Sequence, residues 1–176
     1  IPANALAGYY GGATDQLSAQ VDGQWAIFSG ASDVLQVVDP LLLSKEYTDD
    51  PVPLGGTVTL EFTITNDDPE RAATELAFTD DLDAVVSGMV AVGLPLSDVC
   101  GAGSLLSGTS LVTFSGGNLA AAGSCTITVD VEIPSSTAPA TYLNTTSEIF
   151  EAGAPAGEPA TADLVVEPAV AAAAGV

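Results

Sequence analysis

Apolar and polar residues alternate with a period of two along much of the chain, and the alternation is clearest after residue 40. Between residues 57 and 65 every second residue is apolar, namely Val58, Leu60, Phe62 and Ile64. Residues 125–133 repeat the pattern with Ile127, Val129, Val131 and Ile133. Successive side chains of a β-strand point to opposite faces. Each segment is therefore predicted to be a strand with one face packed on a core.

Shorter alternating segments lie at residues 111–115 and 161–166, and residues 141–149 show a more mixed pattern. Runs rich in Gly, Pro, Asn and Asp predict turns between the segments, at residues 54–56, 66–69, 115–118 and 122–123. Residues 152–160 are expected to form a loop before the last strand. About seven strands between residues 41 and 167 predict an all-β fold, an immunoglobulin-like antiparallel β-sandwich.

The predicted organisation is an N-terminal extended arm at residues 1–38, the sandwich at 39–167 and a small-residue tail at 168–176. The arm contains the single tryptophan and is too short to bury a core of its own. It either adds strands to its own sandwich, donates a strand to another subunit, or belongs to a neighbouring module. In strand donation, backbone pairing and side-chain pockets provide the affinity. The arm residues expected at such an interface are Tyr9, Tyr10, Trp25, Ile27, Phe28, Val34, Leu35 and Val37.

The strong excess of acidic residues, together with the absence of histidine, excludes several classes of function. The chain has 23 acidic and 2 basic residues, no histidine, and a formal net charge of −21. Nucleic-acid binding and attraction to anionic membranes both need Lys and Arg, so neither is expected. Without histidine, imidazole catalysis is excluded, and no carboxylate pair stands out as a glycosidase acid and base. We predict a protein that is not an enzyme and needs no cofactor, and no apolar run reaches the ~20 residues of a membrane span.

The chain begins at Ile1, which predicts that a signal peptide has been removed; a boundary set elsewhere in a longer chain is the alternative. Cys100 and Cys125 are the two cysteines, and their number and spacing do not fit a structural zinc site. In an exported protein they are expected to form one disulfide, the alternative being two buried thiols. An extracellular or cell-surface location is predicted.

Acidic residues gather in two predicted turns, and calcium binds oxygen ligands supplied by such loops. The candidate ligands are Asp67, Asp68, Asp80, Asp81 and Asp83. Their spacing is not that of an EF-hand, and solvated carboxylates that keep the protein soluble are the alternative.

Lys45 has two alternative roles. It could form an isopeptide bond with Asn66 or Asn144, as in some surface immunoglobulin-like domains, provided that a buried carboxylate lies beside it; otherwise it is a surface lysine at the start of a strand. Asn144 also begins an Asn-Thr-Thr glycosylation sequon, for which a structural role in a strand is the preferred interpretation.

Several motifs occur in order along residues 41–167. Leu-Ser-Lys at 43–45 precedes Pro-x-Gly-Gly-Thr at 53–57, and Phe-Thr-Asp at 78–80 precedes Thr-Tyr-x-Asn-Thr at 141–145. Residues 41–167 thereby resemble the DUF11-like repeat modules of bacterial surface proteins. The resemblance implies an immunoglobulin-like sandwich, a cysteine pair and a place on the cell surface or in the extracellular matrix; it implies no activity.

Two features depart from that family. Asp83 stands where the family usually has proline, and this chain holds one module where family members often carry tandem arrays. A single module must attach to something by other means.

These observations predict an extracellular structural protein, a self-assembling subunit of a bacterial surface filament or fibre, whose partners are copies of itself. Charge repulsion between subunits is screened over ~8 Å at physiological salt, so assembly would depend on apolar burial and backbone pairing. The alternative is an adhesin or matrix module that binds a glycan or protein through loops at one end of the sandwich.

Overall fold

A computed structural model describes residues 8–15, 17–22, 24–37 and 41–168. The chain divides into two units, residues 1–39 and residues 40–176, and each is described on its own. Of the predicted arm and tail, residues 1–7 and 169–176 lie outside the described residues.

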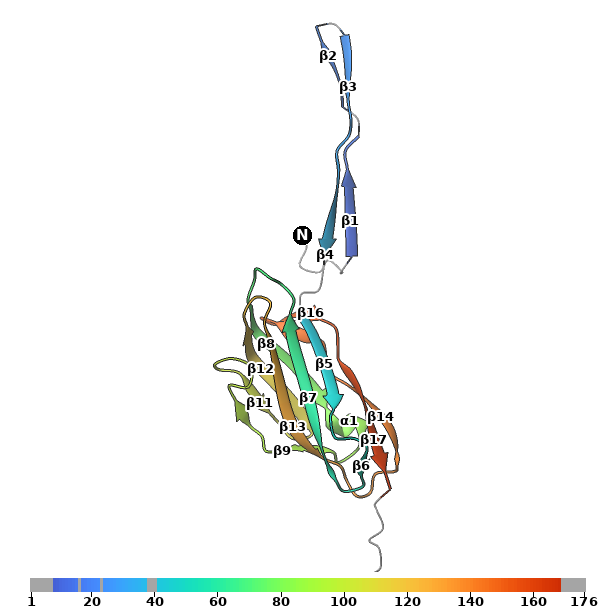
Figure 1. Cartoon of the computed structure of the whole chain (residues 1–176), viewed down its shortest axis with the longest axis vertical. Helices are drawn as coiled ribbons and strands as arrows, with labels where there is room; N and C mark the ends of the chain where they lie inside the picture. The colour runs from blue at the N-terminus through green and yellow to red at the C-terminus, as the bar shows by residue number, and fades with distance from the viewer. Residues whose placement is uncertain (1–7, 16, 23, 38–40, 169–176) are drawn as a thin grey trace, which may run out of the picture. The chain divides into compact units, whose positions relative to one another are not determined.

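The first unit consists of two successive two-stranded antiparallel ladders (Figure 1). Its described residues within 8–37 are called the ribbon. Its four strands are β1 (Gly8–Ala13), β2 (Leu17–Val21), β3 (Gln24–Phe28) and β4 (Ser32–Val37). β1 pairs with β4, and β2 pairs with β3, both antiparallel. Thr14 joins the two ladders, because its backbone N–H donates to the carbonyl of Ala31 (2.8 Å) and its Oγ1 accepts from the N–H of Ala31 (3.0 Å). Asp22, after β2, has φ 52°, as a tight hairpin turn requires.

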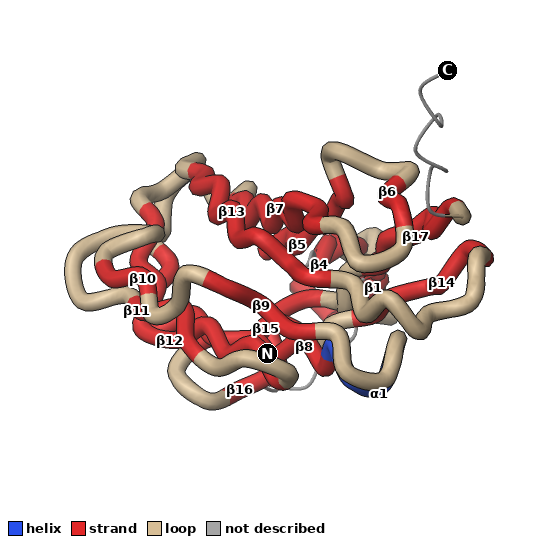
Figure 2. Tube along the Cα trace, turned by 90° about the horizontal axis from the view of Figure 1, so that it is seen from below, coloured by secondary structure: helices blue, strands red, loops and turns tan. Residues whose placement is uncertain are grey.

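The second unit, called the sandwich (residues 41–168), contains three sheets (Figure 2). In spatial order, the four-stranded sheet consists of β5 (Leu41–Tyr47), β7 (Thr57–Asn66), β13 (Ser124–Glu132) and β9 (Val90–Val92). The six-stranded sheet consists of β10 (Leu96–Ser97), β11 (Leu105–Ser107), β12 (Leu111–Leu119), β8 (Ala73–Asp81), β15 (Ile149–Glu151) and β16 (Ala154–Gly157). The three-stranded sheet consists of β14 (Ala140–Thr145), β17 (Thr161–Glu167) and β6 (Val52–Pro53).

The predicted all-β sandwich is confirmed. The described helical part is a single turn, α1 (Leu82–Val85). Seven strands of the sandwich have six or more residues, and the other six are short: β6, β9, β10, β11, β15 and β16. Pairing is antiparallel except between β17 and β6.

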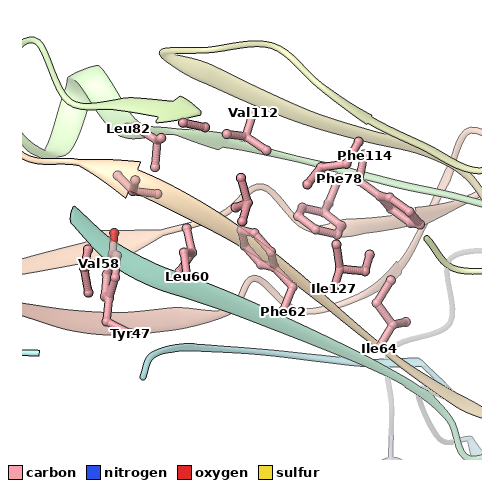
Figure 3. Close-up of a cluster of buried hydrophobic side chains, with 14 of the residues drawn as sticks. Tyr47, Val58, Leu60, Phe62, Ile64, Phe78, Leu82, Val112, Phe114 and Ile127 are labelled. Atoms are coloured by element: carbon pink, nitrogen blue, oxygen red, sulfur yellow. The ribbon is translucent and has the colours of Figure 1, made fainter. Parts of the chain in front are cut away.

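The core lies between the four-stranded and six-stranded sheets. The alternation assigns eight residues to the core, four on β7, three on β13 and Ile133 directly after β13. All eight are buried, which confirms that prediction. Three aromatic rings cross from one sheet to the other (Figure 3). Phe62 on β7 lies 4.9 Å from Phe78 on β8, and Phe78 lies 5.2 Å from Phe114 on β12, measured between ring centroids. Such contacts add stability beyond the burial of apolar area.

Two predicted connections are strands in the structure. Residues 115–118, expected as a turn, continue β12 through irregular register. Gly116 has φ 69°, and a Cβ at Gly117 would lie 2.5 Å from Cζ of Phe114, so the glycines allow a bulge beside a core ring. Residues 152–160, expected as a loop, contain β16, which pairs with β15 across Ala152 and Gly153.

Candidate functional site

The sandwich buries a lysine, an aspartate and an asparagine together. Lys45 comes from β5, Asp80 from β8 and Asn144 from β14, so each of the three sheets supplies one residue. The side chains of Lys45 and Asp80 are 0% exposed, and Asn144 is also 0% exposed. Charged residues are seldom fully buried unless they are paired, so the group must be organised around specific contacts.

The carboxylate of Asp80 is the centre of this group. Nζ of Lys45 donates to Oδ2 of Asp80 at 2.6 Å, and Nδ2 of Asn144 donates to the same oxygen at 3.3 Å. Nδ2 of Asn144 also donates to the hydroxyl oxygen of Tyr47 at 2.7 Å. Oδ1 of Asp80 and Oδ1 of Asn144 are buried and have no hydrogen-bond partner. An amine and a primary amide thus share one acceptor, while two further acceptors are unsatisfied.

Burial dominates the electrostatics of the group. It lowers the pKa of Lys45 from 10.5 to about 8, although the charge of Asp80 and its hydrogen bond act in the opposite direction. Burial also raises the pKa of Tyr47, so this phenol stays protonated. Nζ of Lys45 lies 5.6 Å from the centroid of the Phe62 ring. The lysine therefore has a substantial neutral fraction near pH 8, and a neutral amine is a nucleophile.

The structure excludes one alternative for Lys45 and bears on the two roles considered for Asn144. The interpretation of Lys45 as a surface lysine is wrong, because its side chain is buried against Asp80. Asn66 is also buried, but its Nδ2 donates to the carbonyls of Arg71 (2.7 Å) and Ala120 (3.0 Å). Asn144 is the asparagine that shares an acceptor with Lys45. Its burial also supports the structural role over glycosylation, which requires an exposed side chain.

Sequence reasoning identified Lys45 and Asn144 but placed Asp80 in an acidic turn. A signal for Asp80 was available, since Leu76, Phe78 and Asp80 occupy alternate positions of β8 and all three are buried. Tyr47 follows Lys45 in the same way on β5. A polar residue that continues an apolar alternation is a candidate for burial.

The other proposed calcium ligands have separate local partners. Asp68 accepts from the backbone N–H groups of Glu70 (2.9 Å) and Arg71 (3.0 Å), and these bonds lower its pKa. Asp81 caps α1 by accepting from the N–H of Ala84 at 3.1 Å. Among the residues that the structure describes, no group of three or more Asp, Glu, Cys or His is placed to hold a metal ion.

Asp83 accepts from the N–H of Gly88 at 2.7 Å, and Asp67 follows the end of β7. Because Asp80 faces the core, the five candidate carboxylates do not form one site. Calcium binding stays a prediction.

The predicted arm residues lie in the ribbon. Trp25 and Ile27 occupy alternate positions of β3 and are 69% and 68% exposed. The side chains of the other six lie outside the described part of the structure, although their backbones are placed in β1, β3 and β4: Tyr9, Tyr10, Phe28, Val34, Leu35 and Val37. Whether these residues form an interface between subunits stays a prediction.

Cys100 and Cys125 form a disulfide with a Cα–Cα distance of 5.7 Å. Cys100 lies between β10 and β11 of the six-stranded sheet, and Cys125 lies in β13 of the four-stranded sheet. The bond therefore connects the two sheets that enclose the core.

The sandwich is thus an all-β domain with an inter-sheet disulfide and a buried Lys–Asp–Asn group. By its sequence the chain belongs to the DUF7933 family, a domain of unknown function, whose model matches residues 40–166. The resemblance to DUF11-like modules is therefore supported only at the level of an uncharacterised, β-rich domain. A search of curated proteins finds no match.

Solved structures with a similar fold include the seventh ScaB type I cohesin of Pseudobacteroides cellulosolvens, with 10% identity, a TM-score of 0.45, and coverage of 76% of this chain and 97% of the cohesin. BslA, a bacterial hydrophobin, has 10% identity and a TM-score of 0.39, covering 74% and 96%. A family 123 glycoside hydrolase from Clostridium perfringens has 9% identity and a TM-score of 0.42, covering 74% of this chain. This chain spans 28% of the hydrolase.

No helix in the described part of the chain has the length and apolar character needed to cross a membrane.

Proposed function

We propose that this chain is an extracellular structural protein, a self-assembling subunit of a bacterial surface filament or fibre whose ribbon joins it to another copy. The observation that carries the proposal is the exposure of Trp25 and Ile27 on a ribbon whose strands pair with one another. A two-stranded ribbon alone is marginally stable in water. A partner surface that covers it would supply the missing burial.

The exposed face of the ribbon suits an apolar contact. Trp25 pairs across the ribbon with Gln20, and Ile27 pairs with Ser18, so the two apolar side chains lie on one face between small or neutral polar neighbours. Fully burying a side chain such as Ile27 contributes about 1.5–3 kcal/mol, and tryptophan has more area to bury. Two such residues would account for a large part of a specific contact.

The distribution of charge also favours the ribbon as the place where copies of the chain associate. Residues 8–37 contain three acidic residues, Asp15, Asp22 and Asp33, and no basic residue, whereas the whole chain carries a net charge of −21. Repulsion between copies is therefore weaker at the ribbon than at the sandwich. Contacts through the ribbon allow copies to associate while the acidic sandwiches discourage lateral clumping.

The ribbon also offers backbone pairing, since each strand of a two-stranded ladder has one open edge. An open edge can add to another sheet, which is the basis of strand donation. A ribbon that binds the sandwich of the next copy makes a head-to-tail contact, and repetition of such a contact gives a fibre. The disulfide supports an oxidising, extracellular location.

The test uses the full chain and negative-stain electron microscopy over a range of protein and salt concentrations. The assembly variant is Trp25→Ser combined with Ile27→Ser. The matched control is Leu143→Ser on β14, which removes an apolar residue of similar exposure, 64%, from the sandwich. We expect wild type and the control to form fibres and the assembly variant to remain monomeric.

Wild-type protein that stays monomeric under all conditions would contradict the proposal and favour the adhesin or matrix alternative. Fibres formed equally well by the assembly variant would show that Trp25 and Ile27 do not make the contact.

A further inference from the structure

The buried group contains more than an ion pair. A lysine that is buried for stability alone needs only its carboxylate, yet Oδ2 of Asp80 also accepts from the side-chain amide of Asn144. In the described part of the chain three buried side-chain oxygens have no hydrogen-bond partner, and two of them, Oδ1 of Asp80 and Oδ1 of Asn144, belong to this group. Buried polar atoms without partners are rare in native proteins and call for an explanation. A nucleophile, an electrophile and a proton carrier are the components of an acyl transfer.

We propose that Lys45 and Asn144 condense within the folded chain to form an isopeptide bond, with Asp80 carrying the protons. The inference goes beyond the proposed function and does not depend on it. Nζ of Lys45 and Nδ2 of Asn144 both donate to Oδ2 of Asp80. The amide carbon Cγ of Asn144 is bonded to Nδ2, so the carbon to be attacked lies next to the nitrogen that shares this oxygen with the amine. Holding reacting groups together in this way replaces a collision by an intramolecular step.

The reaction begins with proton transfer along the 2.6 Å hydrogen bond from Nζ of Lys45 to Oδ2 of Asp80. The product is a neutral amine beside a neutral carboxylic acid. Burial supports this transfer, because a low-dielectric interior disfavours charged groups and lowers the pKa of Lys45 to about 8. Protonated Asp80 then supplies a donor for Oδ1 of Asn144, an acceptor that otherwise has no partner.

Nζ of Lys45 attacks Cγ of Asn144, and the carbonyl electrons move to Oδ1, where the acid of Asp80 stabilises the developing charge. One proton of Nζ passes through Asp80 to Nδ2. The bond from Cγ to Nδ2 breaks, the carbonyl re-forms, and Nδ2 leaves as ammonia. The product is a Lys45–Asn144 amide beside a protonated Asp80. The starting groups are an ammonium ion, a carboxylate and a primary amide. The products are a secondary amide, a carboxylic acid and ammonia. Atoms and charge are equal on the two sides, so no other reactant is needed.

The new bond would join β5, the first strand of the sandwich, to β14, near its end. Tension applied at the two ends of the sandwich would pass through the Lys45–Asn144 link, and the intervening residues would not carry it. The hydroxyl oxygen of Tyr47 accepts from Nδ2 only before the reaction, so its contact with Asn144 orients the amide and is released when ammonia leaves.

Intact-mass measurement of the reduced, denatured full chain tests the bond. We expect wild type to be lighter than its sequence by the mass of one ammonia. Wild type at the full sequence mass would overturn the proposal, and this result needs no variant. Reduction first removes the contribution of the Cys100–Cys125 disulfide from the measured mass.

Trypsin gives a second readout, because the chain has two cleavage sites, Lys45 and Arg71. Trypsin does not cleave after an acylated lysine. In wild type, cleavage after Arg71 should therefore leave residues 1–71 and 72–176 joined as one branched molecule, even after reduction and denaturation. Separation into unlinked fragments would contradict the proposal.

The matched variant is Lys45→Arg, which keeps the positive charge and the tryptic site but has no nucleophilic amine. We expect full sequence mass and three separate tryptic fragments from this variant, and full mass from Asn144→Ala. Loss of ammonia that persists in Lys45→Arg would indicate a cyclic imide and overturn the proposal. Asn66→Ala is the control for an unrelated buried asparagine and should still lose ammonia.

Asp80→Asn keeps the size of the side chain and removes the proton carrier. We expect it to retain full sequence mass. Complete condensation in Asp80→Asn would overturn the role of Asp80.

Discussion

The disulfide between the two core sheets gives the most direct stability prediction. The perturbation is the double variant Cys100→Ala, Cys125→Ala, which removes the bond and leaves no thiol in the chain. The cysteines are 25 residues apart, and the chain-entropy relation for a loop of this size gives about 3.5 kcal/mol of stabilisation through the unfolded state. Cys100 is 2% exposed, so the lost sulfur packing adds to this figure.

For a domain of this length, each kcal/mol changes Tm by roughly 3–5 °C, so the double variant should melt about 10–18 °C below wild type. Circular dichroism melts measure Tm, and guanidinium unfolding measures the free energy of unfolding. The denaturant m-value should rise in the variant, because its unfolded state is less compact. Reductant is the control and should lower the Tm of wild type but not that of the variant. A variant with the Tm and m-value of wild type would refute the reasoning.

Three further predictions concern the core and the buried lysine. Phe78→Ala removes the middle ring of the aromatic row and should lower the free energy of unfolding by about 3–5 kcal/mol, measured by denaturant unfolding. Gly117→Ala places a methyl group against Phe114 and should cost about 1–3 kcal/mol in the same assay; an unchanged value would mean that the bulge is not needed there. In Asn144→Ala, Lys45 keeps a free amine whose pKa is about 8 when buried and near 10.5 when unfolded, so the unfolded state binds more protons between these values. Stability of this variant should therefore rise with pH across that window, whereas crosslinked wild type should show no such rise.

The sequence predicted the sandwich well where alternation is strict. β7 carries four apolar residues at alternate positions, β13 carries three and Ile133 directly follows it, and the structure buries them all. The prediction of a turn at residues 115–118 was wrong, because glycine occurs both in turns and in strand bulges. Gly116 and Gly117 are typical of turns, but tertiary packing against Phe114 places them in a bulged strand, and that packing is not a local property of the sequence.

The buried group was predicted in part. The sequence offers Lys45 and Asn144 as possible partners, but it places Asp80 in an acidic turn, as a candidate calcium ligand or a solvated carboxylate, because it precedes Asp81 in a run of acids. Composition alone favours exposure for such a run. The alternation of β8 places Asp80 on the inner face, and the meeting of β5, β8 and β14 depends on the fold, so local patterns could not show that the three side chains lie together.

The central claim is that the ribbon joins copies of this chain, and Trp25 reports on it directly because it is the only tryptophan. The measurement is its fluorescence emission and its quenching by uncharged acrylamide, followed from dilute monomer to concentrated protein at several salt concentrations. Trp25 is 69% exposed in the single chain, so dilute protein should emit as a solvated indole and be readily quenched. We predict that emission moves to shorter wavelength and quenching falls as fibres form. Fibres in which Trp25 keeps the emission and quenching of the monomer would contradict the claim.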